Sequence, residues 1–286
     1  MATILITGCS SGFGNLATRE LSAAGHSVVA SMRDPLGRNQ KAARELAELS
    51  GVRVLELDVT QDDSVSKAAE LAGDVDAVIH NAGLGITGVA EGSTTEQLSY
   101  IMEVNLIGVH RLNRAVLPGM RARKSGLLIY VSSGLGRTVL PYMSAYCASK
   151  YALEAYAETL SYELSTHGID TVILQPGAYP SGFRGNILKP DDQDRLADYP
   201  VEQAEAESIH RNISEMLQSE MAPDPHDVTR AMLKVIEMPR TERPLRVALR
   251  KDSGGLKMIN QICGEVQGAL LRGMNLEHRL PKRPQL

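Results

Sequence analysis

The chain has 286 residues, of which 43% are hydrophobic and 22% are charged, and its formal net charge is −4. This length suffices for a full hydrophobic core, so the composition predicts one domain with at most an appended lobe. The acidic balance argues against nucleic acid as a partner, because phosphate binding usually accompanies a basic excess. The apolar runs are shorter than a membrane span, and residues 1–7 carry no feature of a signal peptide. We therefore expect a cytoplasmic protein with no membrane span.

The three cysteines, Cys9, Cys147 and Cys263, are odd in number and lie far apart in the sequence. None of them has the paired Cys or His spacing of a zinc site, and three cysteines do not make a disulfide framework. We expect reduced thiols and no bound metal.

Apolar runs of strand length alternate with helical patterns along the first two thirds of the chain. The runs occupy residues 3–7, 27–32, 52–57, 77–80, 126–132 and 171–174. Between them, apolar residues recur at three- and four-residue spacing over residues 15–24, 40–49, 62–72, 95–120 and 144–167. Near-continuous apolar strands that alternate with helices are typical of a parallel sheet covered on both faces. The prediction is an α/β fold with a doubly wound parallel sheet, a three-layer Rossmann fold with right-handed crossovers.

Three glycines, Gly8, Gly12 and Gly14, follow the first predicted strand and open the first predicted helix. At this place Gly8 can form a tight turn, while Gly12 and Gly14 let the backbone approach a pyrophosphate at the positive end of the helix. Their spacing, Gly-x-x-x-Gly-x-Gly, differs from the Gly-x-Gly-x-x-Gly of most dinucleotide folds. The alternative is a glycine-rich turn that binds no ligand.

A second motif places Tyr146 four residues before Lys150 in a helical pattern, so both side chains lie on one helix face. A phenol with a pKa near 10 transfers protons poorly at neutral pH unless a cation stabilises its anion. A fall of two or three units in the pKa of Tyr146 asks roughly 3–4 kcal/mol of the Lys150 ammonium and a nicotinamide charge together. This pair is therefore predicted to perform proton transfer.

Ser133 ends the fifth predicted strand, thirteen residues before Tyr146, where a parallel sheet opens its ligand crevice. Its hydroxyl is a candidate to hold a substrate oxygen. Ser132 competes with it, and only the spacing to Tyr146 favours Ser133. The remaining alternative is that both serines cap a turn.

From residue 3 to about residue 183 the chain resembles the short-chain dehydrogenase/reductase family, which uses this glycine spacing. Residues 32–35, 83–85 and 144–150 look most like the branch that contains hydroxysteroid and retinol dehydrogenases. The resemblance implies that Ser133 orients a carbonyl, Tyr146 is the acid/base, and Lys150 also binds the nicotinamide ribose. It further implies that Asn105 helps a water relay reach Lys150.

The same resemblance assigns a nicotinamide cofactor to the glycine turn and to the segments that follow later strands. Asp58 and Val59 would contact adenine, and Asn81 would lie near the ribose. The implied cofactor-binding residues, besides Arg33, are Gly8, Ser10, Ser11, Gly12, Phe13, Gly14, Asp58, Val59, Asn81, Ala82, Gly83, Tyr146, Lys150, Pro176, Gly177 and Ser181. His80 stands where many members carry Asn, and we expect it to be packed without a role in the chemistry.

The end of the second predicted strand favours NADP(H) over NAD(H). An NAD site usually places a carboxylate there to hold the ribose hydroxyls, but this chain has Met32 followed by Arg33. Arg33 suits a 2′-phosphate, and Ser11 can add a hydroxyl contact. Asp34 would repel the phosphate if it faced the cofactor.

Beyond residue 183 the resemblance is weak. We expect a core at 1–183, a substrate-lid insertion at 184–226, and a C-terminal part at 227–286. An amphipathic helix over 201–217 turns Ile209, Ile213, Met216 and Leu217 toward an apolar surface, either as a lid or as a packed surface helix. A helix over 227–237, a strand over 245–248 and a tail from Asn275 onward complete the prediction.

These features predict an NADP(H)-dependent oxidoreductase that interconverts a secondary alcohol and a ketone, or an alcohol and an aldehyde. Its partner is a small-molecule carbonyl or alcohol whose skeleton the sequence does not define. One alternative is an NADP-binding sensor or scaffold without turnover, which the complete Asn105, Ser133, Tyr146 and Lys150 set disfavours. The other is a nucleotide-sugar epimerase or dehydratase, which the glycine spacing disfavours.

The resemblance also implies a homodimer or homotetramer that pairs the long predicted helices over 95–120 and 144–167. Leu153, Ala157, Leu160 and Leu164 form an apolar stripe on the second of these. We expect this stripe to be available for the interface.

Overall fold

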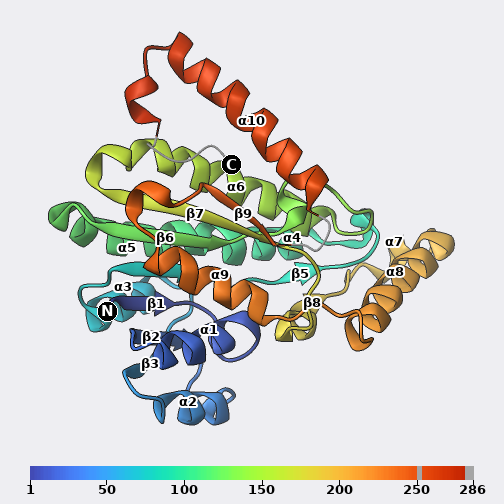
Figure 1. Cartoon of the computed structure of the whole chain (residues 1–286). Coiled ribbons are helices and arrows are strands. Elements are labelled where there is room, and N and C mark those ends of the chain that lie inside the picture. The colour runs from blue at the N-terminus through green and yellow to red at the C-terminus, as the bar shows by residue number, and fades with distance from the viewer. Residues whose placement is uncertain (250–252, 281–286) are drawn as a thin grey trace.

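A computed structural model of the chain describes residues 1–249 and 253–280. Seven parallel strands form one sheet in the order β3-β2-β1-β4-β6-β7-β9 (Figure 1). The strands are β1 (Thr3–Ile6), β2 (Ser27–Met32), β3 (Val52–Glu56), β4 (Ala77–His80), β6 (Gly126–Val131), β7 (Ile169–Pro176) and β9 (Arg246–Leu249). The predicted doubly wound α/β fold is confirmed.

Helices cover both faces of the sheet, and each face has its own hydrophobic core. One core is formed with α3 (Asp62–Ala72), α5 (Gly108–Arg123) and α6 (Ser144–Glu163). The other is formed with α1 (Gly12–Ala23), α2 (Gln40–Ala47) and α9 (His226–Glu237). The strands are apolar almost throughout because both faces are buried in this way.

The strand order reverses beside β1, which pairs with β2 on one side and with β4 on the other. In an open parallel sheet this reversal leaves a crevice at the carboxyl ends of the strands, where ligands bind. The loops after β1, β4, β6 and β7 all open at this edge, so the fold brings the predicted site segments together.

The long helix predicted over residues 95–120 is three consecutive elements. They are α4 (Thr95–Met102), a π-helical turn (Glu103–Ile107) and α5. Thr94 and Gln97 form a capping box that fixes the start of α4. A π-turn inserts one extra residue per turn and often marks a functional site, and this one carries Asn105.

The C-terminal third contains elements that the periodicity predicts and two that it missed. The predicted helices and closing strand are α8 (Pro200–Gln218), α9 and β9. The missed elements are α10 (Gly254–Gly273) and a small parallel sheet of β5 (Gly85–Ile86) and β8 (Ile187–Leu188), which lies before the short helix α7 (Gln193–Leu196). Of the predicted tail, Glu277–Arg279 is a 3₁₀ turn and residues 281–286 lie outside the described residues.

The apolar stripe of α6 is not available for an interface, which corrects the sequence expectation. Leu153, Ala157, Leu160 and Leu164 are all buried within the chain, in the core between α6 and the sheet. The periodicity identified a real apolar face, but that face packs on β-strands of the same molecule. Any interface between copies must use other residues of this helix.

Two further observations concern the described part of the chain. No helix in it is long and apolar enough to cross a membrane. No group of three or more His, Cys, Asp or Glu side chains in it is arranged to hold a metal ion.

Candidate active site

One large cavity, of about 1550 Å³, lies at the carboxyl edge of the sheet. Its lining includes Ser133, Tyr146 and Lys150 together with the predicted cofactor residues of every segment, from the glycine turn to Ser181. Gly14 and Asn105 are the two predicted site residues that lie behind its wall. Segments separated by more than 170 positions in the sequence thus meet around one space.

The glycine turn after β1 needs its glycines for conformation and for room. Gly8 and Gly12 have φ angles of +74° and +57°, which side chains disfavour. A Cβ on Gly14 would lie 2.5 Å from the Gly8 carbonyl oxygen and 2.6 Å from the side-chain nitrogen of Asn81. The turn therefore brings bare backbone and the first turn of α1 to the cavity, which is the cradle that a pyrophosphate requires.

The segment after β4 holds this turn in place. The Asn81 side chain donates to the carbonyl oxygens of Thr7 and Gly8, at 2.9 and 3.1 Å. In return, the Thr7 hydroxyl accepts the backbone N–H groups of Asn81 and Ala82, both at 3.0 Å. The side chain of Asn81, predicted as a cofactor contact, thus also clamps β1 to β4.

The turn after β2 places a cation in the cavity and its carboxylate elsewhere. Arg33 lines the cavity and donates to the hydroxyl of Tyr100 at 3.2 Å. Asp34, at φ +47°, accepts from the backbone N–H of Arg38 at 2.8 Å and does not line the cavity. The repulsion that Asp34 could have exerted on a phosphate is thereby removed.

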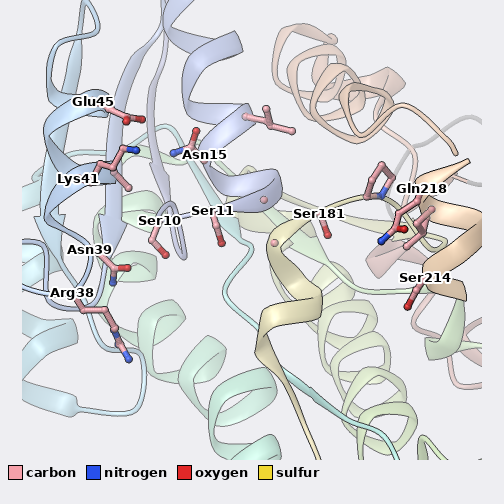
Figure 2. A pocket seen from close by; sticks show the side chains of 16 residues that line it. Ser10, Ser11, Asn15, Arg38, Asn39, Lys41, Glu45, Ser181, Ser214 and Gln218 are labelled. Atoms are coloured by element: carbon pink, nitrogen blue, oxygen red, sulfur yellow. The ribbon is translucent and has the colours of Figure 1, made fainter. Parts of the chain in front are cut away.

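Arg38 and Asn39 are cavity residues that the sequence analysis missed. Both also line an adjoining groove of about 790 Å³ outside the glycine turn. Figure 2 shows this groove, with Arg38, Asn39 and Lys41 on one side, Ser214 and Gln218 on the other, and Ser11 between them. A second arginine five positions after Arg33 was a visible signal, but only the turn after β2 brings it to the same cavity.

Tyr146, Ser133 and Lys150 are buried where α6 begins and β6 ends. The Lys150 ammonium donates to the carbonyl oxygen of Val131 at 2.9 Å and lies 5.7 Å from the centre of the Tyr146 ring. The four-residue spacing in α6 therefore places the phenol and the ammonium beside each other, as expected for a helix face.

Burial dominates the titration of this pair. It raises the pKa of Tyr146 to about 12, against the lowering effect of the hydrogen bond with Ser133. It also lowers the pKa of Lys150 to about 8, against the raising effect of the Glu154 charge. For the chain by itself the pKa of Tyr146 thus moves opposite to the expected direction, because loss of hydration outweighs the nearby cation.

The choice between the two serines favours Ser133. Its hydroxyl is hydrogen-bonded with Tyr146 and also accepts the backbone N–H of Leu135 at 3.1 Å, so it both caps a turn and meets the phenol. Ser132 also lines the cavity, but its hydroxyl is buried without a hydrogen-bond partner.

Asn105 acts on the wall of the cavity. Its side chain accepts from the Leu84 N–H at 3.0 Å and donates to the Leu84 carbonyl and to the Ser149 hydroxyl, both at 2.9 Å. The amide thereby joins the loop after β4 to the catalytic helix α6. Its participation in a water relay stays a prediction.

His80 is packed away from this chemistry, as expected. Its ring stacks on Tyr130 with the ring centres 4.9 Å apart, and its Nε2 lies 2.8 Å from the side-chain oxygen of Asn113. Burial lowers its pKa to about 4, so the imidazole stays neutral at physiological pH.

A buried polar cluster beneath Lys150 was not foreseen. Glu154, one turn further along α6, accepts from Arg246 of β9 at 2.8 Å and from Gln175 of β7 at 2.9 Å. Arg246 also bonds Glu158 at 2.5 Å. Such buried charges occur only when paired, and no sequence pattern pairs residues some ninety positions apart.

The far part of the cavity is apolar. All four residues that the sequence assigned to the inner face of α8 line it, which accounts for that amphipathic pattern. The apolar side chains of this part are Leu135, Leu140, Met143, Phe183, Ile209, Ile213, Met216, Leu217 and Met221.

Taken together, the parallel sheet, the glycine cradle and the Tyr-Lys pair define a dinucleotide-dependent oxidoreductase. A family model described as short chain dehydrogenase matches residues 2–192. Human retinol dehydrogenase 8 is 34% identical over 254 residues, which cover 85% of this chain and 80% of the relative. The chain belongs to the short-chain dehydrogenase family and is an enzyme that acts on CH–OH groups.

Two further comparisons span nearly the whole chain. Human 17-beta-hydroxysteroid dehydrogenase type 1 is 32% identical over 287 residues, with 93% of this chain and 86% of the relative covered. A crystal structure of a short-chain dehydrogenase from Streptomyces avermitilis is 28% identical, with a TM-score of 0.77 over 96% of this chain and 97% of the other. The resemblance to the branch that contains hydroxysteroid and retinol dehydrogenases is confirmed.

Proposed function

We propose that this enzyme interconverts a secondary alcohol and a ketone, or an alcohol and an aldehyde, with NADP(H) and with Tyr146 as acid/base. The observation that carries the proposal is that Tyr146, Ser133 and Lys150 open into the same cavity as the glycine cradle. A carbonyl held there would contact a proton donor and face the nicotinamide end of a bound cofactor.

The nicotinamide supplies or accepts a hydride at the carbinol carbon when the cofactor is bound. In the reductive direction, the Tyr146 hydroxyl gives its proton to the carbonyl oxygen as that oxygen gains negative charge. Ser133 donates a hydrogen bond to the same oxygen and fixes its position. Lys150 stabilises the phenolate that remains, and the proton returns to Tyr146 from solvent in the next cycle.

The raised pKa of Tyr146 gives the cationic groups a second role. A phenol of pKa about 12 keeps its proton at neutral pH, which suits the donor role in reduction. In the oxidative direction, each unit of that pKa which must be recovered corresponds to about 1.4 kcal/mol of phenolate stabilisation. Lys150 contributes only while it is protonated, which its pKa of about 8 permits at neutral pH.

The preference for NADP(H) is supported by two cations at one turn. Arg33 and Arg38 both line the cavity beyond β2, while the Asp34 carboxylate bonds backbone outside it. A 2′-phosphate at this end would be held by charge-assisted hydrogen bonds.

Replacing Arg33 with Ala tests the cofactor assignment. We expect at least about a tenfold loss of NADPH affinity in a fluorescence titration, or about 1.4 kcal/mol, with NADH affinity little changed. The exchange Arg121→Ala, on the exposed end of α5, is the matched control. Unchanged NADPH affinity in the Arg33 variant would remove the assignment.

The substrate is proposed to be an apolar alcohol or carbonyl compound. The support is the apolar far wall of the cavity, together with the relatives named retinol and hydroxysteroid dehydrogenases. We propose that residues 184–226, which supply α8, form the substrate lid over the core of residues 1–183, and that residues 227–286 complete the sheet. A carbonyl scan for NADPH oxidation, with small polar and bulky apolar ketones compared, tests this class.

We also propose a cytoplasmic homodimer or homotetramer. The exposed apolar side chains of α4, the π-turn and α6 are Leu98, Tyr100, Ile107 and Tyr151, and they replace the buried stripe as interface candidates. A monomeric mass in solution at micromolar concentration would overturn the oligomer.

A further inference from the structure

Helix α10 presents its more apolar face to the outside. Its outward side chains at every fourth position are each more than half exposed, and they are Met258, Ile262, Val266, Leu270 and Met274. Four-residue steps keep these side chains on one slowly winding stripe, which we call the outer stripe. Figure 1 shows α10 along the outer edge of the molecule, beyond α6.

The opposite face, which packs on the body, is less apolar. It carries Leu256 and Leu271 as buried anchors, together with the polar Asn260. Asn260 donates to the side-chain oxygen of Gln175 in β7 at 2.7 Å, so a polar pair helps to fix the helix to the sheet. The outer stripe makes no contribution to this attachment.

An ordinary surface helix has the reverse arrangement, with apolar residues inward and polar residues outward. An exposed row of large apolar side chains usually marks a surface that another body covers. The question is then which body fits the stripe.

Charge distinguishes the candidates. The chain is acidic overall, with 34 Asp and Glu against 30 Lys and Arg. Residues 250–286 reverse this balance, since seven of them are Lys or Arg and three are Asp or Glu. On α10 itself, the exposed Lys257 and Arg272 accompany the stripe, with Glu265 as its one acidic residue.

We infer that α10 lies flat on an anionic lipid surface, with the outer stripe inserted at the headgroup boundary and the basic residues facing the lipid charges. A helix with an apolar face and flanking cations is the form that binds such surfaces. A second copy of the chain fits less well, because two basic segments would then face each other. At 20 residues, α10 offers about 30 Å of contact along the surface.

Vesicle flotation with the full chain tests this inference. The probes are phosphatidylcholine vesicles with and without phosphatidylserine. We expect the chain to float with the anionic vesicles, to bind neutral vesicles much less, and to be released as salt screens the charges.

The stripe is tested by the double exchange Ile262→Glu and Val266→Glu. We expect vesicle binding to fall by at least about tenfold. The matched control is Leu71→Glu with Val201→Glu, because Val201 and Val266 are both 64% exposed and Leu71 and Ile262 are 51% and 54% exposed. NADPH binding in both variants reports that the core remains folded.

The charge is tested by Lys257→Glu with Arg272→Glu, against Lys67→Glu with Arg121→Glu as the control of equal charge change. We expect the α10 pair to lose binding to anionic vesicles by about fivefold for each cation reversed, and the control pair to lose little. Equal losses in both pairs would show that overall charge, not α10, attracts the lipid.

Three results would overturn the inference. The first is a wild-type chain that stays free of anionic vesicles, and the second is a stripe variant that floats as well as its control. The third is a dimer in solution that the stripe variant dissolves while vesicles bind neither protein, which would assign the stripe to a second copy.

Discussion

Two helices of equal length differ in which of their residues they bury. Both α6 and α10 have 20 residues, but ten residues of α6 are buried and only three of α10 are. The buried residues of α6 include the polar Tyr146, Lys150 and Glu154, whereas α10 exposes large apolar side chains.

The difference lies in what each helix can satisfy. The buried charged groups of α6 have partners within the chain, since Lys150 bonds a strand carbonyl and Glu154 bonds Arg246 and Gln175. Burial without such partners would cost several kcal/mol, which proteins accept mainly where the group performs a function. In α10 the apolar face has no partner within the described chain, so its function is expected outside the molecule.

The largest expected effect comes from removing the one buried hydroxyl of α6 that is proposed to move a proton. Tyr146→Phe should lower kcat for carbonyl reduction by about a thousandfold, because general acid catalysis is worth 10²- to 10⁴-fold. NADPH affinity should change less than threefold, roughly. Steady-state kinetics and fluorescence titration measure the two. Tight cofactor binding with unchanged turnover would remove Tyr146 from the mechanism, and tight binding with no turnover in the wild type would favour a sensor.

The contrast in burial should appear as a contrast in stability. Leu153→Ala in α6 should lower the free energy of unfolding by about 3 kcal/mol, since it opens a cavity in the core. Leu270→Ala in α10 removes the same atoms from an exposed position and should cost about 0.5 kcal/mol or less. Urea denaturation measures both. Comparable losses would mean that α10 is covered in solution, for example by a second copy.

The titration of α6 should set the alkaline limit of activity. Lys150 has a pKa of about 8, so its protonated fraction, and with it kcat/KM, should fall about tenfold per unit at higher pH. The Glu154 charge raises that pKa, so Glu154→Gln should move the decline to lower pH. Glu163→Gln, at an exposed position on the same helix, should leave it in place. A decline unaffected by Glu154→Gln would separate Lys150 from this limit.

The smallest effect is expected in the stability of the protein in acid. His80 is neutral when folded, with a pKa of about 4 against an ordinary 6.5. The unfolded chain therefore binds the extra proton between these values, and stability present above pH 6.5 is lost as the pH falls to 4. The loss is at most about 3 kcal/mol at this site. Replacing His80 with Asn should flatten the pH dependence of unfolding over this window, and an unchanged slope would contradict the assignment.

The reach of the sequence differs along the chain. The spacing of Gly8, Gly12 and Gly14 after an apolar strand identified the cradle, since the requirement for missing side chains is local. Likewise the four residues between Tyr146 and Lys150 are fixed by helix geometry. Arg38 and the Glu154 cluster could not be found in this way, because their partners are set by turn conformation and by contacts between distant strands.

Periodicity also misassigned what it correctly detected. The stripe of Leu153 and Leu164 was a genuine apolar face, but a pattern alone does not say whether the covering surface is a strand of the same chain or another molecule. In α10 the apolar positions step by four without a consistently polar face opposite, so the pattern contained no clear amphipathic signal and the helix was missed.

By itself, the sequence determined the alternation of strands and helices, the glycine turn and the spacing of the catalytic residues, because each depends on local backbone preferences and on residues within a few turns. Only the tertiary structure decided where Asp34 points, which arginines share the cavity, how burial shifts the pKa values of Tyr146 and Lys150, and which apolar faces remain uncovered. Those properties depend on hydration and on contacts between distant segments, which come into being only when the chain has folded.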